Sequence, residues 1–163
     1  DSSVRAFKQA IAIRPNYSEA YFNIALAYEE KGFREDAIQA FKRCAIISPV
    51  LAPDAYNSLA IIYRKEGLFA EAIATHGQAI ALRDTSAIFH AARINTYYEA
   101  ERCPEAKALL ESEVQRFPES AELLYACARC LLRNGERAAV EAIVTKLDVL
   151  SPTLAEQLRL MKN

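Results

Sequence analysis

The chain has 163 residues, with 20 Lys and Arg against 21 Asp and Glu and a formal net charge of −1. This balance argues against a nucleic-acid partner, because a surface that follows phosphates carries an excess of basic residues. The chain has only 4 Gly and 6 Pro, so turns are few and helices are expected over most of its length. No apolar run approaches the roughly 18 residues that a membrane helix needs, so we expect no membrane insertion.

The first predicted element is one amphipathic helix over residues 1–17. Val4, Phe7 and Ala10 recur at helical spacing, and Pro15 ends the helix. The segment matches the second helix of a hairpin whose first helix is absent. Its apolar face is therefore available, and self-assembly into homo-oligomers is one hypothesis for function.

Four helical hairpins are predicted next, over residues 18–52, 53–86, 87–120 and 121–152. In the first hairpin, Tyr21 and Ile24 belong to one apolar stripe, and Ala37 and Phe41 belong to the other. A glycine-centred turn separates the two helices, and a proline ends the second. A final amphipathic segment over residues 153–163 is suited to covering the last hairpin.

The hairpins repeat at an interval of 34 residues. Prolines separated by 34, 69 and 34 residues stand at Pro15, Pro49, Pro118 and Pro152. Glycines follow the same interval at Gly32, Gly67 and Gly135. One hairpin cannot bury its apolar faces alone, so neighbouring hairpins must stack into a solenoid. The third hairpin has Arg93 at an apolar place and Glu101 at the glycine place, so we expect local irregularity over residues 100–104.

This pattern resembles the tetratricopeptide repeat family over nearly the whole chain. The first hairpin carries the family's residues in order at Tyr21, Ile24, Ala25, Tyr28, Gly32, Ala37, Phe41, Cys44 and Pro49. The resemblance implies an all-α fold, a right-handed superhelical solenoid of antiparallel helix hairpins in one domain over residues 1–163. This solenoid would hold four full repeats, a leading half repeat and a C-terminal capping helix. It also implies a non-catalytic scaffold that binds a partner peptide or helix in its concave groove.

The family's groove positions, carried onto this chain, are Phe22, Asn23, Leu26, Asn57, Ile61, Asn95, Tyr98, Tyr125, Arg129 and Arg133. Three of them, Leu26, Ile61 and Tyr98, would form an apolar strip. The asparagines either hold a peptide backbone through donor and acceptor atoms or are solvated surface residues. The two arginines, one helical turn apart, either clamp a carboxylate or are ordinary surface charges near a helix end.

No catalytic, cofactor or metal site is predicted. The sequence lacks a glycine-rich phosphate loop and a nucleophile motif, and its two histidines, His76 and His90, fall on core positions. A further hypothesis is that the chain is the substrate-recruiting module of a larger enzyme or secretion complex.

The four cysteines show no evident bridge pattern. Cys44 and Cys127 occupy core positions of their repeats, and the pair Cys127 and Cys130 lies in the middle of a predicted helix, which is unfavourable for redox chemistry. We therefore expect small buried hydrophobic residues in a reducing cytoplasm.

Overall fold

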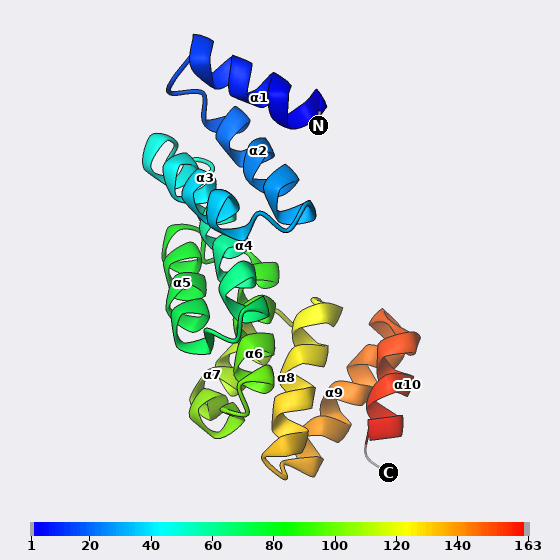
Figure 1. Cartoon of the computed structure of the whole chain (residues 1–163). Helices are drawn as coiled ribbons and strands as arrows, with labels where there is room; N and C mark the ends of the chain where they lie inside the picture. The colour runs from blue at the N-terminus through cyan, green and yellow to red at the C-terminus, as the bar shows by residue number, and fades with distance from the viewer. Residues whose placement is uncertain (1, 162–163) are drawn as a thin grey trace. The chain divides into compact units, whose positions relative to one another are not determined.

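The computed structural model describes residues 2–161, and over this range the chain forms ten α-helices and no strand (Figure 1). The helices are α1 Ser2–Ile13, α2 Ser18–Glu30, α3 Arg34–Ile47, α4 Ala52–Lys65, α5 Phe69–Leu82, α6 Ala87–Glu99, α7 Cys103–Arg116, α8 Ala121–Arg133, α9 Arg137–Leu150 and α10 Pro152–Met161. The predicted all-helical class is confirmed. The last two residues of the expected capping helix lie outside the described range. The helices group into two compact units, unit 1 over residues 1–84 and unit 2 over residues 85–163.

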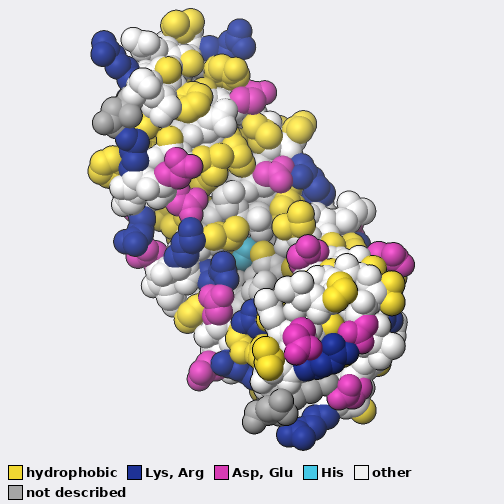
Figure 2. All heavy atoms as spheres, turned by 90° about the vertical axis from the view of Figure 1, so that its right-hand side faces the viewer, with side chains coloured by type: hydrophobic (Ala, Val, Ile, Leu, Met, Phe, Trp, Pro, Cys, Tyr) yellow, Lys and Arg dark blue, Asp and Glu magenta, His cyan; other side chains and the backbone are white. Residues whose placement is uncertain are grey.

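Unit 1 contains the hairpins α2–α3 and α4–α5, with α3 packed on α4 and α1 packed on α2. Its core holds Phe41, Leu59 and Ile62, while the fully buried Ala25 and Ala37 allow α2 and α3 to approach closely. Helix α1 is different because it has no buried residue. Apolar side chains are frequent over the N-terminal helices at the top of Figure 2.

Unit 2 is organised around α8, which packs against α6, α7, α9 and α10. Leu124, Cys127 and Leu131 of α8 face Leu110 of α7 and Val140 of α9 in one buried cluster. Helix α10 covers α8 and α9. Among residues 2–161, no helix combines the length and the apolar character that crossing a membrane requires.

The turns inside the hairpins share one backbone geometry. The glycines of three turns have φ values of 77°, 76° and 78°, in the left-handed region, at Gly32, Gly67 and Gly135. Glu101 occupies the equivalent place in the turn of the third hairpin, with φ 58°. The Arg102 N–H donates to the Tyr97 carbonyl over 2.9 Å, and the glycine turns have the equivalent bond. The hydrogen-bond pattern of this turn is therefore that of the glycine turns. The irregularity predicted over residues 100–104 lies at Glu101, the one non-glycine residue among residues 2–161 that has a positive φ, a conformation that is unfavourable for a residue with a side chain.

The third hairpin has a charged interior that explains its unusual sequence. Glu113 of α7 is only 4% exposed and accepts hydrogen bonds from His90 Nδ1 over 2.7 Å and from Arg93 Nη2 over 3.3 Å. Arg93 thus occupies a normally apolar place because it has a buried carboxylate partner. Both histidines are buried as predicted, and His76 bonds to Asn57 Oδ1 over 3.1 Å.

The cysteine prediction is wrong for two of the four residues. Cys103, the first residue of α7, and Cys130 of α8 form a disulfide with a Cα–Cα distance of 5.2 Å. The spacing along the chain conceals this pair because the two residues come from successive hairpins and meet only after packing. Cys44 and Cys127 are free and buried, as predicted. Since disulfides form and persist in oxidising compartments, the argument for a reducing cytoplasm loses its basis.

Candidate interaction surface

Two arginines of α8 lie against a tyrosine of α6 in unit 2. Arg129 Cζ is 3.8 Å and Arg133 Cζ is 4.0 Å from the centroid of the Tyr98 ring. Arg129 also lies 5.7 Å from the centroid of the Tyr125 ring. Tyr98, Tyr125, Arg129 and Arg133 are called the Tyr–Arg cluster below. Guanidinium groups at these distances are attracted by the electron-rich ring faces, so the cluster is held together by cation–π contacts.

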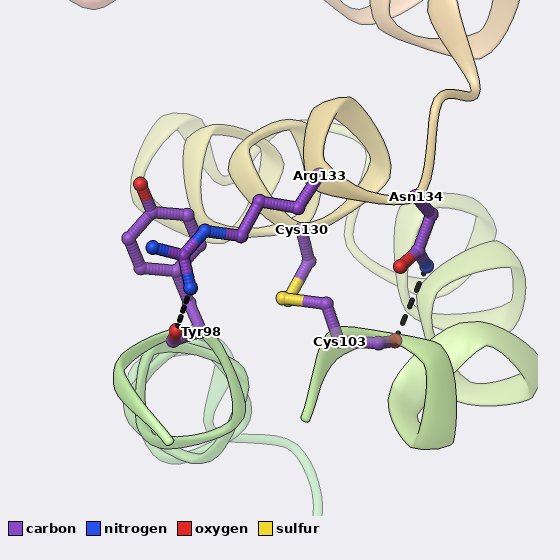
Figure 3. The surroundings of a disulfide bond; sticks show 5 residues. All are labelled: Tyr98, Cys103, Cys130, Arg133 and Asn134. Carbon is purple, nitrogen blue, oxygen red and sulfur yellow. Dashed lines mark hydrogen bonds between the residues drawn. A yellow bond between two sulfur atoms is a disulfide. The ribbon is translucent and has the colours of Figure 1, made fainter. Parts of the chain in front are cut away.

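The helices hold the cluster in place. Arg129 and Arg133 are one turn apart on α8 and therefore share a face. Arg133 Nη1 donates to the backbone carbonyl of Tyr98 over 2.7 Å, and Figure 3 shows its guanidinium group beside the tyrosine ring. Arg133 is thus anchored at the end of α6 by both a hydrogen bond and ring stacking.

Neither arginine of the cluster has a carboxylate partner among residues 2–161. Within that range, Arg129 makes no ion pair or hydrogen bond, and the Arg133 hydrogen bond goes to a neutral carbonyl. Unit 1 provides a comparison. Lys65 and Arg133 each stand two residues before the glycine of their turn, and Lys65 Nζ pairs with Glu29 Oε1 over 2.5 Å. Tyr98 takes the place of Glu29, so this position in unit 2 lacks the neutralising charge.

An open hollow of about 400 Å³ adjoins the cluster. Its lining includes Arg133, Asn134, Glu101 and Cys103. Asn134 Nδ2 donates to the Cys103 carbonyl over 3.2 Å, beside the disulfide (Figure 3). Glu101 lies on the same hollow but forms no ion pair with Arg133 within the described residues.

The predicted apolar groove residues of unit 1 have different surroundings. Phe22 packs edge-on against Phe41, with ring centroids 5.4 Å apart, and so contributes to the core. Leu26 is 38% exposed and lines a hollow of about 300 Å³ whose other residues are charged. Ile61 is half-buried. Leu26 is thus the main exposed apolar residue that α2 places at this surface.

The three predicted groove asparagines do not share one environment. Asn23 is exposed, whereas Asn57 is engaged by the buried His76. Asn95 is half-buried, and its Oδ1 atom has no hydrogen-bond partner. A regular ladder of amides along the surface is therefore absent from these three positions.

Cys103 and Asn134 lie beside the cluster but were not among the predicted site residues. Comparison of equivalent positions in the repeats could have identified them. Arg34 and Cys103 each stand two residues after the left-handed residue of a turn, and Glu66 and Asn134 each stand one residue before it. Arg34 and Glu66 form an ion pair at 2.6 Å, so the same two positions touch in both units.

The two free thiols are poorly reactive. Burial raises the pKa of the Cys127 thiol to about 12 and that of Cys44 to about 11, so both stay protonated and poorly nucleophilic. No group of three or more His, Cys, Asp or Glu within residues 2–161 is arranged to hold a metal ion.

Comparison with protein families identifies the repeat. Models described as TPR repeat or tetratricopeptide repeat match residues 1–32, 18–50, 55–87 and 97–161. The chain belongs to the tetratricopeptide repeat family. The turns at left-handed residues and the paired helices described above are those of tetratricopeptide hairpins. The comparison with curated proteins found no match.

Solved tetratricopeptide repeat structures share the fold over almost the whole chain. MamA is 19% identical with a TM-score of 0.73, and the alignment covers 98% of this chain and 88% of MamA. YrrB, described as a TPR protein with an unusual peptide-binding site, is 14% identical with a TM-score of 0.72, covering 96% and 81%. TPR-like repeats of a putative kinesin light chain from Podosopora anserina are 18% identical with a TM-score of 0.69, covering 90% and 84%. At these identities the likeness establishes the fold alone.

Proposed function

We propose that the chain is a non-catalytic protein-interaction scaffold whose Tyr–Arg cluster binds an acidic segment of a partner protein. The observation that carries the proposal is the pair of guanidinium groups that lie on Tyr98 without a carboxylate partner. A peptide-binding site is also named for YrrB, which shares the fold.

The chemistry of the cluster favours a carboxylate ligand. Guanidinium groups present planar N–H donors that match the two oxygens of a carboxylate. Arg129 makes no hydrogen bond to the described residues, so its N–H donors are available. Arg133 donates through Nη1 to the Tyr98 carbonyl and keeps its other N–H donors for a ligand. The rings on which both groups stack hold their planes in place and so reduce the entropy that binding costs.

A nucleic-acid ligand is a poorer fit for this surface. The net charge of the chain is −1, and Figure 2 shows acidic and basic side chains interspersed over one face. A surface that follows a phosphate backbone needs an extended run of basic residues. Two local arginines suit a few acidic side chains of a peptide.

In unit 1, Leu26 and Ile61 remain candidate contacts for apolar side chains of a partner. The exposure of Leu26 in its hollow supports this role. The charged residues around Leu26 favour a partner segment that mixes apolar and polar residues. The pair Leu26→Arg and Ile61→Arg is expected to weaken that contact, and equal affinity of this variant would remove these residues from the site.

A second candidate function, self-assembly, is favoured by helix α1. It has no buried residue, and Ile13 is 86% exposed. Val4, Phe7 and Ile11 on its apolar face are only partly covered by the core of unit 1, and a partly covered apolar face invites association with another copy. Light scattering over a concentration series tests this idea, because a constant monomer mass would exclude it for this chain.

The test of the Tyr–Arg cluster uses a fluorescein-labelled oligo-glutamate peptide and an oligo-glutamine peptide as the uncharged control. We expect fluorescence polarisation to detect binding of the first peptide only, with an affinity that falls as salt rises. The variant Arg129→Ala/Arg133→Ala should bind the oligo-glutamate peptide about tenfold more weakly, or weaker still. Arg43→Ala/Arg137→Ala removes the same charge at exposed positions of α3 and α9 and should bind normally. Equal losses in both variants would contradict a local site.

A further inference from the structure

We propose that the Cys103–Cys130 disulfide is a redox-controlled link that keeps the Tyr–Arg cluster in its binding geometry. This inference rests on the proposed function, because it assigns regulation to the same surface. It predicts that the protein binds an acidic segment more tightly in the disulfide form than in the dithiol form.

The disulfide joins the parts of unit 2 that meet at the cluster. Cys130 lies one helical turn before Arg133 on α8, and Cys103 begins α7 immediately after the turn that follows Tyr98. Two hydrogen bonds flank the covalent bond, from Arg133 to the Tyr98 carbonyl and from Asn134 to the Cys103 carbonyl (Figure 3). The three links together hold the α6–α7 turn against the end of α8. Loss of the covalent one leaves two exchangeable hydrogen bonds at the turn, beside the apolar packing of α6 and α7 against α8.

The turn that the disulfide holds is the strained one. Glu101 has φ 58°, whereas glycine occupies this place in the other three turns. A side chain in the left-handed region is disfavoured, because its Cβ approaches the backbone carbonyl too closely. Once the disulfide is broken, relaxation of Glu101 is expected to move the end of α6, which carries Tyr98. Arg133 then loses both its carbonyl acceptor and its stacking partner.

Only two redox states of this site are expected. Cys127 is one turn from Cys130 on α8, but burial raises the pKa of its thiol to about 12 and keeps it protonated. A protonated thiol does not attack a disulfide, so exchange inside α8 is suppressed. Reduction by a dithiol breaks the S–S bond and places two electrons and two protons on Cys103 and Cys130, while the reductant becomes a cyclic disulfide. The sulfur atoms are buried, so the reductant reaches them when the strained turn opens.

The experiment compares the oxidised wild-type chain, the same chain reduced with dithiothreitol, and the variant Cys103→Ala/Cys130→Ala. Cys127→Ala is the matched control, because it removes a buried sulfur from α8 and keeps the disulfide. The first measurement is amide hydrogen exchange over residues 99–103, which needs no ligand. The second is fluorescence polarisation with the labelled oligo-glutamate peptide. Circular dichroism first checks that each form remains helical.

We expect the reduced chain and the double-alanine variant to exchange faster over the turn and to bind about two- to tenfold more weakly, because Arg133 must be ordered again on binding. Cys127→Ala should behave like wild type in both measurements. Adding Glu101→Gly to the double-alanine variant removes the strain and should restore slow exchange and affinity.

Equal exchange and equal affinity in the oxidised and unlinked forms would overturn the proposed link and leave the proposed function standing. Absence of peptide binding in every form, including oxidised wild type, would instead refute the proposed function. In that case the exchange data alone test whether the disulfide holds the turn, and unchanged exchange over residues 99–103 overturns the proposed link. If the double-alanine variant is unfolded, the reduced wild-type chain supplies the same comparison.

Discussion

Replacing both cysteines of the disulfide by alanine is expected to destabilise unit 2 by about 3.5 kcal/mol. The bond joins Cys103 and Cys130, which are separated by 27 residues. In the chain-entropy model, freeing a loop of this length raises the entropy of the unfolded state by an amount equivalent to about 3.5 kcal/mol at 25 °C. For a chain of this size, that loss lowers the melting temperature by about 10 °C.

Urea and thermal unfolding followed by circular dichroism measure this difference under non-reducing conditions. Cys127→Ala calibrates the cost of removing a buried sulfur, which should be about 1 kcal/mol. Reducing agent should bring the wild-type chain to the stability of the double-alanine variant, with no effect on that variant itself. A double-alanine variant within about 1 kcal/mol of Cys127→Ala would show instead that the covalent link adds nothing to stability.

Three further predictions concern thiol access, the buried charges and the turns. A thiol reagent should find almost no reactive group in the native protein at pH 8, two thiols after unfolding and four after unfolding and reduction. Glu113→Gln should cost about 1–3 kcal/mol in urea unfolding, because Arg93 loses its buried carboxylate, whereas Glu111→Gln at an exposed position should cost under about 0.5 kcal/mol. Glu101→Gly should stabilise the chain by about 1 kcal/mol and Gly135→Ala should destabilise it similarly, so the same sign for both would contradict the left-handed assignment.

The repeat interval was enough to predict the fold class, since each hairpin turn needs a residue that tolerates a left-handed backbone. Gly32, Gly67 and Gly135 meet that need and recur at the predicted interval. The turn of the third hairpin lacks this glycine. Glu101 shows that packing and a covalent link can hold a residue with a side chain in a conformation that its own preference opposes.

The four residues of the Tyr–Arg cluster were among the groove positions expected from the sequence, but the contacts between them were not predictable. Tyr98, Tyr125, Arg129 and Arg133 all came from the family's groove positions, and the structure brings these four residues together in unit 2. Both guanidinium groups lie on one ring because of the way in which α6 and α8 pack. The sequence of a single helix does not determine that packing. Tyr98, assigned from sequence to an apolar strip, instead supports two cations.

The buried charges and the disulfide were missed for a common reason. Glu113 belongs to the second helix of its hairpin, and its partners His90 and Arg93 lie in the first. Cys103 and Cys130 likewise come from different hairpins. Contacts between helices follow the repeat register, as the pair Arg34 and Glu66 shows. Periodicity along one helix does not contain that information.

We propose that Arg129 and Arg133 of α8 form a carboxylate-binding surface. Nuclear magnetic resonance of the arginine Nε–H groups during titration with the oligo-glutamate peptide measures whether these two side chains contact the ligand. We expect saturable shifts for Arg129 and Arg133, none for the exposed Arg137, and loss of the response when Tyr98 is replaced by alanine. Binding that leaves the signals of Arg129 and Arg133 unmoved would contradict the claim and place the interaction elsewhere on the chain.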